Sequence, residues 1–186
     1  MKKLVAMFLL CVSMQVSALE LEGLKLEESV QLENSPLVLN GAGVRSIVFF
    51  KMYAVALYLS EKQHDTGAIL ADAKPKRIAL HVLVGEGDLE RFLNGFRKGI
   101  EKNHSEAQLA ALNERMAAFD KLFAAVKKVK RGDVIAFDWL PASGTRVSLN
   151  GNSLGDIAGE DFYRALLSIW LGTKPVKEDV KKALLG

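Results

Sequence analysis

The sequence predicts an α+β domain in which helices pack on one face of an antiparallel β-sheet. Three observations lead to this fold class. Alternating or continuous apolar runs near both ends of the chain predict strands. Residues 88–127 repeat apolar side chains at helical spacing, so helices are grouped between the two sets of strands. Tight turn signals such as Asn150-Gly151 favour antiparallel neighbours.

The first half of the chain is predicted to be mainly strand. Two weak alternating runs are broken by a turn at Asn34-Ser35-Pro36. A run rich in Val, Ile, Phe, Tyr and Leu then predicts a buried strand, or a tight pair of strands, entered through a turn at Gly41-Ala42-Gly43. The predicted elements are strands at 21–27, 30–33, 41–61 and 77–84 and a short helix at 66–71.

The second half alternates between helices and a strand meander. Asp88 opens a helix that runs to about Lys102, and Ser105 with Gln108 forms a capping-box signature for the next helix. That helix is expected to extend to about Lys127, where a basic cluster complements the helix dipole. The remaining predicted elements are strands at 133–140, 145–149 and 153–157 and helices at 161–171 and 176–185.

The first residues have the pattern of a secretory signal peptide. Lys2 and Lys3 precede an apolar run from residue 4 to residue 12, and small residues end at Ala18. The run is too short for a permanent membrane-spanning helix. We therefore expect residues 1–18 to be removed and residues 19–186 to form a single domain in the periplasm. A lipoprotein is the weaker alternative, because Leu10 before Cys11 is larger than lipoprotein cleavage normally accepts.

Composition and motifs argue against several function classes. Cys11 is the only cysteine and leaves with the signal peptide, so the mature chain has no disulfide or thiolate chemistry of its own. The mature chain is close to neutral, which gives no reason to propose nucleic-acid binding. His64, His81 and His104 lack metal-ligand spacing. Dinucleotide and phosphate-binding fingerprints are also missing, so we predict neither a metal nor a cofactor.

Three polar side chains interrupt the apolar run at residues 41–61. Alternate residues of a strand share a face, so Arg45, Lys51 and Tyr53 are predicted to lie on one surface if no bulge intervenes. A guanidinium group presents a planar set of donors that suits a carboxylate. This surface is therefore a candidate anion-binding site.

Each candidate also has a structural interpretation. Arg45 can pair with a buried acid or with carbonyl groups, and Lys51 can extend its ammonium group to water from a strand edge. Tyr58, on the opposite face, is predicted to be a core residue. The phenylalanines at positions 92, 96, 119 and 123 form a helical stripe that suits either a core or the wall of an apolar ligand cavity.

Two segments resemble the chalcone isomerase fold family. The first is the order G-A-G-V-R from Gly41 to Arg45 followed by the lysine-led strand at 51–59, and the second is the C-terminal helix pair at 162–186. The chain resembles the secreted bacterial branch of this family. The resemblance implies an open-faced sandwich of antiparallel sheet and helices. It also implies that Arg45 matches an arginine that holds substrate in the enzymes and lies in the ligand cleft of fatty-acid-binding members.

The catalytic positions of the family are not retained. Tyr53 stands where the enzymes carry a threonine, and a gap-free alignment places Leu89 and Phe92 at the catalytic tyrosine and the lysine that follows it. Hydrogen-bond donors that act in a transition state are worth about a hundredfold in rate each. The resemblance therefore favours a non-catalytic protein.

Three functional hypotheses remain. The first is a periplasmic protein that binds a small amphipathic anion, such as a fatty acid, with Arg45 at the carboxylate and Tyr53 and Lys51 assisting. The second is an isomerase or intramolecular lyase that acts on a chalcone-like or enone substrate. The third is a protein-interaction module with a vestigial cleft. Fold alone does not choose among them, and no protein partner is predicted.

Overall fold

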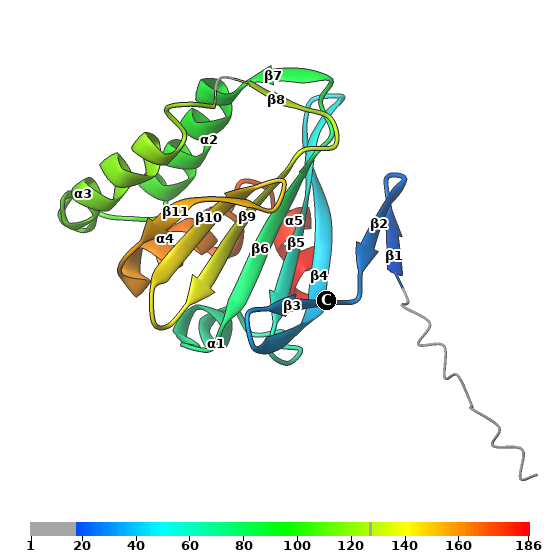
Figure 1. Cartoon of the computed structure of the whole chain (residues 1–186), viewed down its shortest axis with the longest axis horizontal. Coiled ribbons are helices and arrows are strands. Elements are labelled where there is room, and N and C mark those ends of the chain that lie inside the picture. The colour runs from blue at the N-terminus through cyan, green and yellow to red at the C-terminus, as the bar shows by residue number, and fades with distance from the viewer. Residues whose placement is uncertain (1–17, 127) are drawn as a thin grey trace, which may run out of the picture.

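The computed structural model describes residues 18–126 and 128–186, coloured in Figure 1. The predicted signal peptide lies outside the described residues except for Ala18. The described part forms one curled antiparallel sheet with strand order β11-β10-β9-β6-β5-β4-β3. Its strands are β3 (Ser29–Leu32), β4 (Ser35–Ile47), β5 (Phe50–Leu59), β6 (Lys76–Val82), β9 (Val134–Leu140), β10 (Gly144–Leu149) and β11 (Asn152–Ile157).

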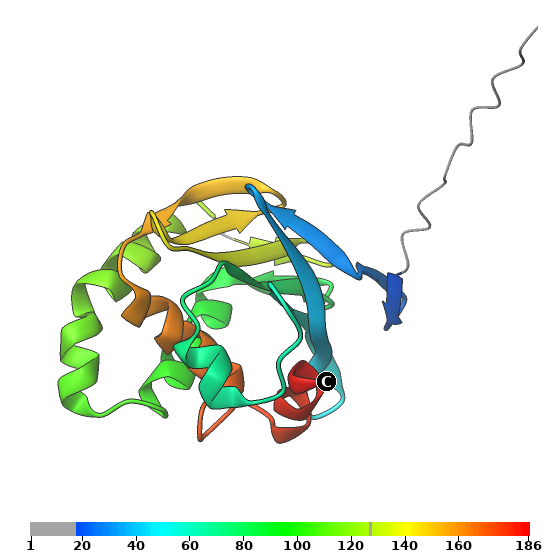
Figure 2. The ribbon, with the colours of Figure 1, turned by 90° about the horizontal axis from the view of Figure 1, so that it is seen from below.

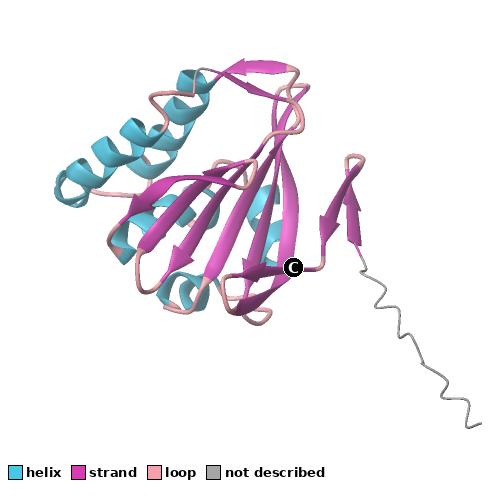
Figure 3. Cartoon of the chain, viewed as in Figure 1, coloured by secondary structure: helices cyan, strands magenta, loops and turns pink. Residues whose placement is uncertain are grey.

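Two small two-stranded sheets flank this sheet. One joins β1 (Ala18–Leu21) to β2 (Leu24–Glu27), and the other pairs β7 (Glu86–Asp88) with β8 (Lys128–Lys130). The described helices are α1 (Thr66–Ala71), α2 (Leu89–Glu101), α3 (Glu106–Leu122), α4 (Glu160–Leu171) and α5 (Glu178–Leu185). Figure 3 shows the helices gathered on one side of the sheet, which confirms the predicted α+β class. None of them is long and apolar enough to cross a membrane within the described residues.

The sheet curls around α4, as the view from below in Figure 2 shows. Phe162, Tyr163, Leu166 and Trp170 of this helix are almost fully buried. They belong to the main core together with the inner faces of β5, β6 and β9. A helix that is apolar on nearly every side is expected where protein surrounds it.

Several local predictions are confirmed. Helix α1 has the predicted bounds, and the Ser105 and Gln108 side chains form the predicted capping box. Asn150 and Gly151 turn between β10 and β11 with positive φ angles of 53° and 78°. These elements depend mainly on interactions between residues close in sequence.

Two predictions are wrong. The glycines at 41 and 43 do not form a turn but lie inside the long strand β4. Helix α3 ends at Leu122, before the basic cluster, whose Lys128 and Lys130 belong to β8 instead. Pairing with β7 decided the conformation of this segment over the helix dipole.

Helix α5 explains the glycines of β4. A Cβ atom on Gly41 would overlap the Ala183 carbonyl oxygen, and one on Gly43 would lie 3.1 Å from the Ala183 Cβ atom. A glycine inside a strand often marks the close approach of another backbone. The two glycines therefore allow α5 to lie directly on β4.

We expect Gly41→Ala to lower the free energy of unfolding by about 1–3 kcal/mol, because the added methyl group must displace the backbone of α5. Gly95→Ala is the matched control, because a Cβ atom there meets nothing within 4 Å. In helix α2 this change is expected to raise stability by about 0.5–1 kcal/mol. Urea unfolding of both variants measures the difference, and equal stabilities would contradict the close packing of α5 on β4.

Candidate functional site

One site candidate is a cavity of about 950 Å³ at one end of the sheet. Strands β4 and β5, helices α2 and α4, and the segment before α5 contribute to its wall. Its lining is mostly apolar and contains a few polar groups, which is typical of small-molecule sites. The lining residues are Arg45, Ile47, Phe50, Met52, Tyr53, Val84, Arg91, Phe92, Asn94, Gly95, Phe96, Lys98, Val129, Ile169 and Val176.

Arg45 is partly buried in the wall of this cavity. Its Nη1 atom donates a long hydrogen bond of 3.4 Å to the Val176 carbonyl oxygen. Within the described residues, its guanidinium group has no carboxylate partner. A guanidinium group carries five N–H donors, so this bond uses only one of the donors of Arg45. The side chain is available to an anion that enters the cavity.

Tyr53 lies directly opposite Arg45 in the β4–β5 ladder. Its ring is buried and makes an edge contact with Phe92, with the ring centroids 5.3 Å apart. The Trp170 Nε1 atom donates a hydrogen bond of 3.1 Å to the Tyr53 hydroxyl oxygen. Among the described residues no acceptor receives the phenol proton, so the hydroxyl can still donate one hydrogen bond.

Burial controls the ionisation of this phenol. Removal from water raises the pKa of Tyr53 to about 12, although the nearby Arg45 charge and the Trp170 hydrogen bond both act to lower it. At neutral pH the hydroxyl is therefore protonated. It can donate a hydrogen bond but is a poor general base.

Comparisons with known proteins show the family and the fold of the chain. A model of the chalcone isomerase-like family matches residues 18–186. The chain belongs to the chalcone isomerase-like family. The structure is also similar to a crystal structure of a fatty-acid binding protein from Arabidopsis thaliana, with a TM-score of 0.68 and 17% identity, covering 88% of this chain and 92% of that chain. This similarity shows the fold, and no curated protein sequence matches the chain.

Lys51 does not lie on the strand face that the sequence predicts. Arg45 pairs with Tyr53, but the next pair is Ser46 with Lys51, so Met52 is an extra residue in β5. This bulge moves Lys51 to the opposite face of the strand. Its ammonium group is exposed and forms an ion pair with Glu22 in the β1–β2 turn. Lys51 is not among the residues that line the cavity.

Leu89 and Phe92, which the alignment places at catalytic positions, do not lie together at the cavity. Phe92 lines the cavity beside Tyr53, whereas Leu89 is buried on another side of α2. Leu89 contributes instead to a smaller pocket of about 310 Å³ that is bordered by the Arg97–Asp120 ion pair. Tyr58 lies in a second apolar cluster on the outer face of the sheet, as its predicted core role requires.

Sequence reasoning did not identify the polar side of the cavity. Arg91, Asn94 and Lys98 lie along one face of α2 and contribute to the lining. Their three- and four-residue spacing is the available signal. The same helix also carries an apolar stripe, and a polar face opposite such a stripe normally faces solvent, so the sequence alone does not mark it as part of a site. The described residues contain no cluster of three or more potential metal ligands.

The pKa of Tyr53 predicts alkaline destabilisation. A phenol with a pKa near 10 in the unfolded chain and about 12 when folded stabilises the native state below pH 10, and this contribution is lost as pH rises to 12. The full loss is about 2–3 kcal/mol. We expect Tyr53→Phe to show a smaller fall in the free energy of unfolding over this range than the wild type. Urea unfolding at several pH values measures it, and parallel pH curves would contradict it.

Proposed function

We propose that this family member is a non-catalytic binding protein for a small amphipathic anion, such as a fatty acid. The carboxylate lies against the Arg45 guanidinium group and accepts a hydrogen bond from the Tyr53 hydroxyl. The tail occupies the apolar part of the cavity beside Phe92, Phe96 and Ile169. The observation that carries this proposal is the partly buried Arg45 side chain, which faces an apolar cavity without a carboxylate partner in the described chain.

The size and chemistry of the cavity support this ligand class. Its volume of about 950 Å³ lies near the upper end of the range for small-molecule sites. A charged donor in partly desolvated surroundings forms a stronger hydrogen bond than one in water. The fatty-acid binding protein from Arabidopsis thaliana has the same fold, which makes a fatty acid the first ligand to test.

The described lining supports binding rather than turnover. Its ionisable side chains are Arg45, Tyr53, Arg91 and Lys98, and none of the described lining residues is a carboxylate or a histidine. A ligand thus meets hydrogen-bond donors and cations. The neutral Tyr53 phenol orients a carboxylate and does not abstract a proton at neutral pH.

The proposed location is the periplasm. Residues 1–18 provide the export signal in this proposal, and residues 18–186 match the family. Export would place the cavity in a compartment bordered by membranes, where amphipathic anions are available. Amino-terminal sequencing of protein from a periplasmic fraction tests both the location and cleavage after Ala18.

We expect Arg45→Gln to weaken palmitate binding by about 10- to 100-fold, because a hydrogen bond to a charged group contributes about 1.5–3 kcal/mol. Isothermal titration calorimetry of delipidated protein measures the affinity. Native mass spectrometry before delipidation, followed by organic extraction, identifies any ligand that copurifies with the protein.

Lys51→Gln is the matched control. It also removes one cation from the same hairpin, but Lys51 lies outside the cavity and pairs with Glu22. We expect it to retain wild-type affinity. An unliganded wild-type protein that does not bind palmitate, or equal effects of the two substitutions, would refute the proposed anion site. Turnover of a chalcone panel that is abolished by Arg45→Gln would instead support the isomerase hypothesis.

A further inference from the structure

The turn between β4 and β5 exposes four consecutive apolar residues. Ile47, Val48, Phe49 and Phe50 have exposed fractions of 48%, 79%, 92% and 74%, and we call these residues the apolar tip. In the described chain, the only other exposed large apolar residue is Leu19. Single exposed apolar residues are common, but a contiguous group usually marks an interaction surface.

The geometry of the turn does not require this composition. Two other tight turns of the chain place a polar residue and a glycine at positive φ, namely Glu22-Gly23 and Asn150-Gly151. The turn between β4 and β5 has Val48 at a φ of 55°, a conformation that is unfavourable for a β-branched residue. Local strain of this kind is often kept at functional sites. The apolar tip therefore carries a backbone cost at Val48.

The apolar tip also borders the ligand cavity. Ile47 and Phe50 pair across the turn and line the cavity, whereas Val48 and Phe49 do not. Arg45 is only two residues before the tip on β4. A surface that contacts Val48 and Phe49 therefore lies next to the proposed binding site.

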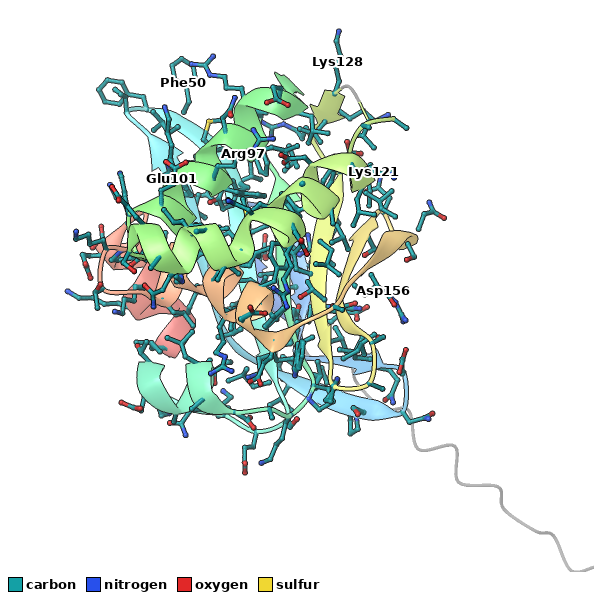
Figure 4. The ribbon with its side chains drawn as sticks, turned by 90° about the vertical axis from the view of Figure 1, so that its left-hand side faces the viewer. Phe50, Arg97, Glu101, Lys121, Lys128 and Asp156 are labelled. Atoms are coloured by element: carbon teal, nitrogen blue, oxygen red, sulfur yellow. The ribbon has the colours of Figure 1, made fainter. Side chains whose placement is uncertain are left out.

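Cations lie on the other side of the same cavity. Arg91 and Lys98 of α2 are exposed lining residues, and within the described chain neither has an ion-pair partner. The acid Glu90 on this helix pairs with Arg97 instead. Figure 4 shows Phe50 and Lys128 at the same end of the molecule.

We propose that the apolar tip inserts into an anionic lipid bilayer, with Arg91 and Lys98 near the lipid phosphates. Aromatic and aliphatic side chains enter the interfacial region, while basic residues are attracted to anionic headgroups. This orientation brings the cavity to the membrane surface. Four tip residues are few compared with the roughly 20–30 per partner in a stable protein interface, which favours a lipid surface over a protein.

The decisive variant is Val48→Asn/Phe49→Gly. It replaces the two most exposed residues of the tip with the Asn-Gly pair found at residues 150–151, and neither position lines the cavity. Asn accepts the positive φ of residue 48 at lower cost than Val, which offsets the backbone entropy that Gly adds at residue 49, so thermal stability is expected to be close to that of the wild type. Loss of membrane binding in this variant is therefore not explained by unfolding.

Cosedimentation with vesicles tests the proposal on the mature chain, residues 19–186, which contains every described element except the first residue of β1. With phosphatidylglycerol–phosphatidylcholine vesicles, the double variant is expected to bind at least about tenfold more weakly than the wild type. Leu19→Ser is the matched control and should bind normally, because Leu19 lies on β1. Equal binding by the wild type and the double variant, or no binding by the wild type, would overturn the proposal.

A second variant tests insertion directly. Phe49→Trp places an indole at the most exposed position of the tip, while the native Trp139 and Trp170 are buried and provide a constant background. Brominated lipid is expected to quench the added fluorescence. Arg91→Gln/Lys98→Gln should reduce binding to anionic vesicles by about fivefold per residue and leave binding to pure phosphatidylcholine unchanged. Absence of quenching, or tip-dependent dimerisation in place of vesicle binding, would refute membrane docking.

These experiments test membrane docking and ligand binding independently. The Arg45→Gln variant should lose palmitate affinity but still bind vesicles. The Val48→Asn/Phe49→Gly variant should keep palmitate affinity but bind vesicles at least about tenfold more weakly than the wild type. Loss of palmitate binding in the second variant, with vesicle binding retained, would assign the tip to ligand binding and overturn the docking proposal.

Discussion

The contact of α5 with β4 determines how the cavity is built. Asn40 is an extra residue in β4 because the pairing with β5 shifts between Leu39 and Gly41. Its side chain donates hydrogen bonds to the carbonyl oxygens of Leu184, at 2.7 Å, and Gln63, at 2.9 Å. Gly41 then lets α5 approach without a steric clash. This arrangement fixes the segment before α5, whose Val176 lines the cavity and accepts the hydrogen bond from Arg45.

The contact of α5 with β4 also shows which features of the fold the sequence predicts and which it does not. Helix α1 and the β10–β11 turn follow from side chains that act within a few residues, so local patterns were sufficient. The glycines of β4 have no such local cause. They permit a turn and a close backbone contact equally well, and only the position of α5 decides between them. The three-residue strands β7 and β8 are too short to show a periodic pattern.

Local sequence patterns are also insufficient to place all residues of the site. Strand alternation predicts one face for Arg45 and Tyr53, and they do share a face, but through direct pairing across β4 and β5 and not along one strand. Lys51 does not share this face, since a one-residue bulge at Met52 reverses the side on which it lies, and sequence alternation does not reveal a bulge. Arg91 and Lys98 belong to a helix face that is indistinguishable from a solvated one until the tip of the β4–β5 hairpin is placed opposite it.

The two proposals together suggest how the site overcomes the cost of removing a carboxylate from water. Arg45 is already partly buried beside Val176 and Tyr53, so this cation loses part of its hydration during folding and not during ligand binding. A carboxylate that approaches from bulk water must still lose its own hydration shell. A ligand delivered from a bilayer keeps its tail out of water throughout, and the cations at 91 and 98 can hold its headgroup before it reaches Arg45. An apolar tip beside a cationic helix face therefore suits the entry of an amphipathic anion better than either feature alone.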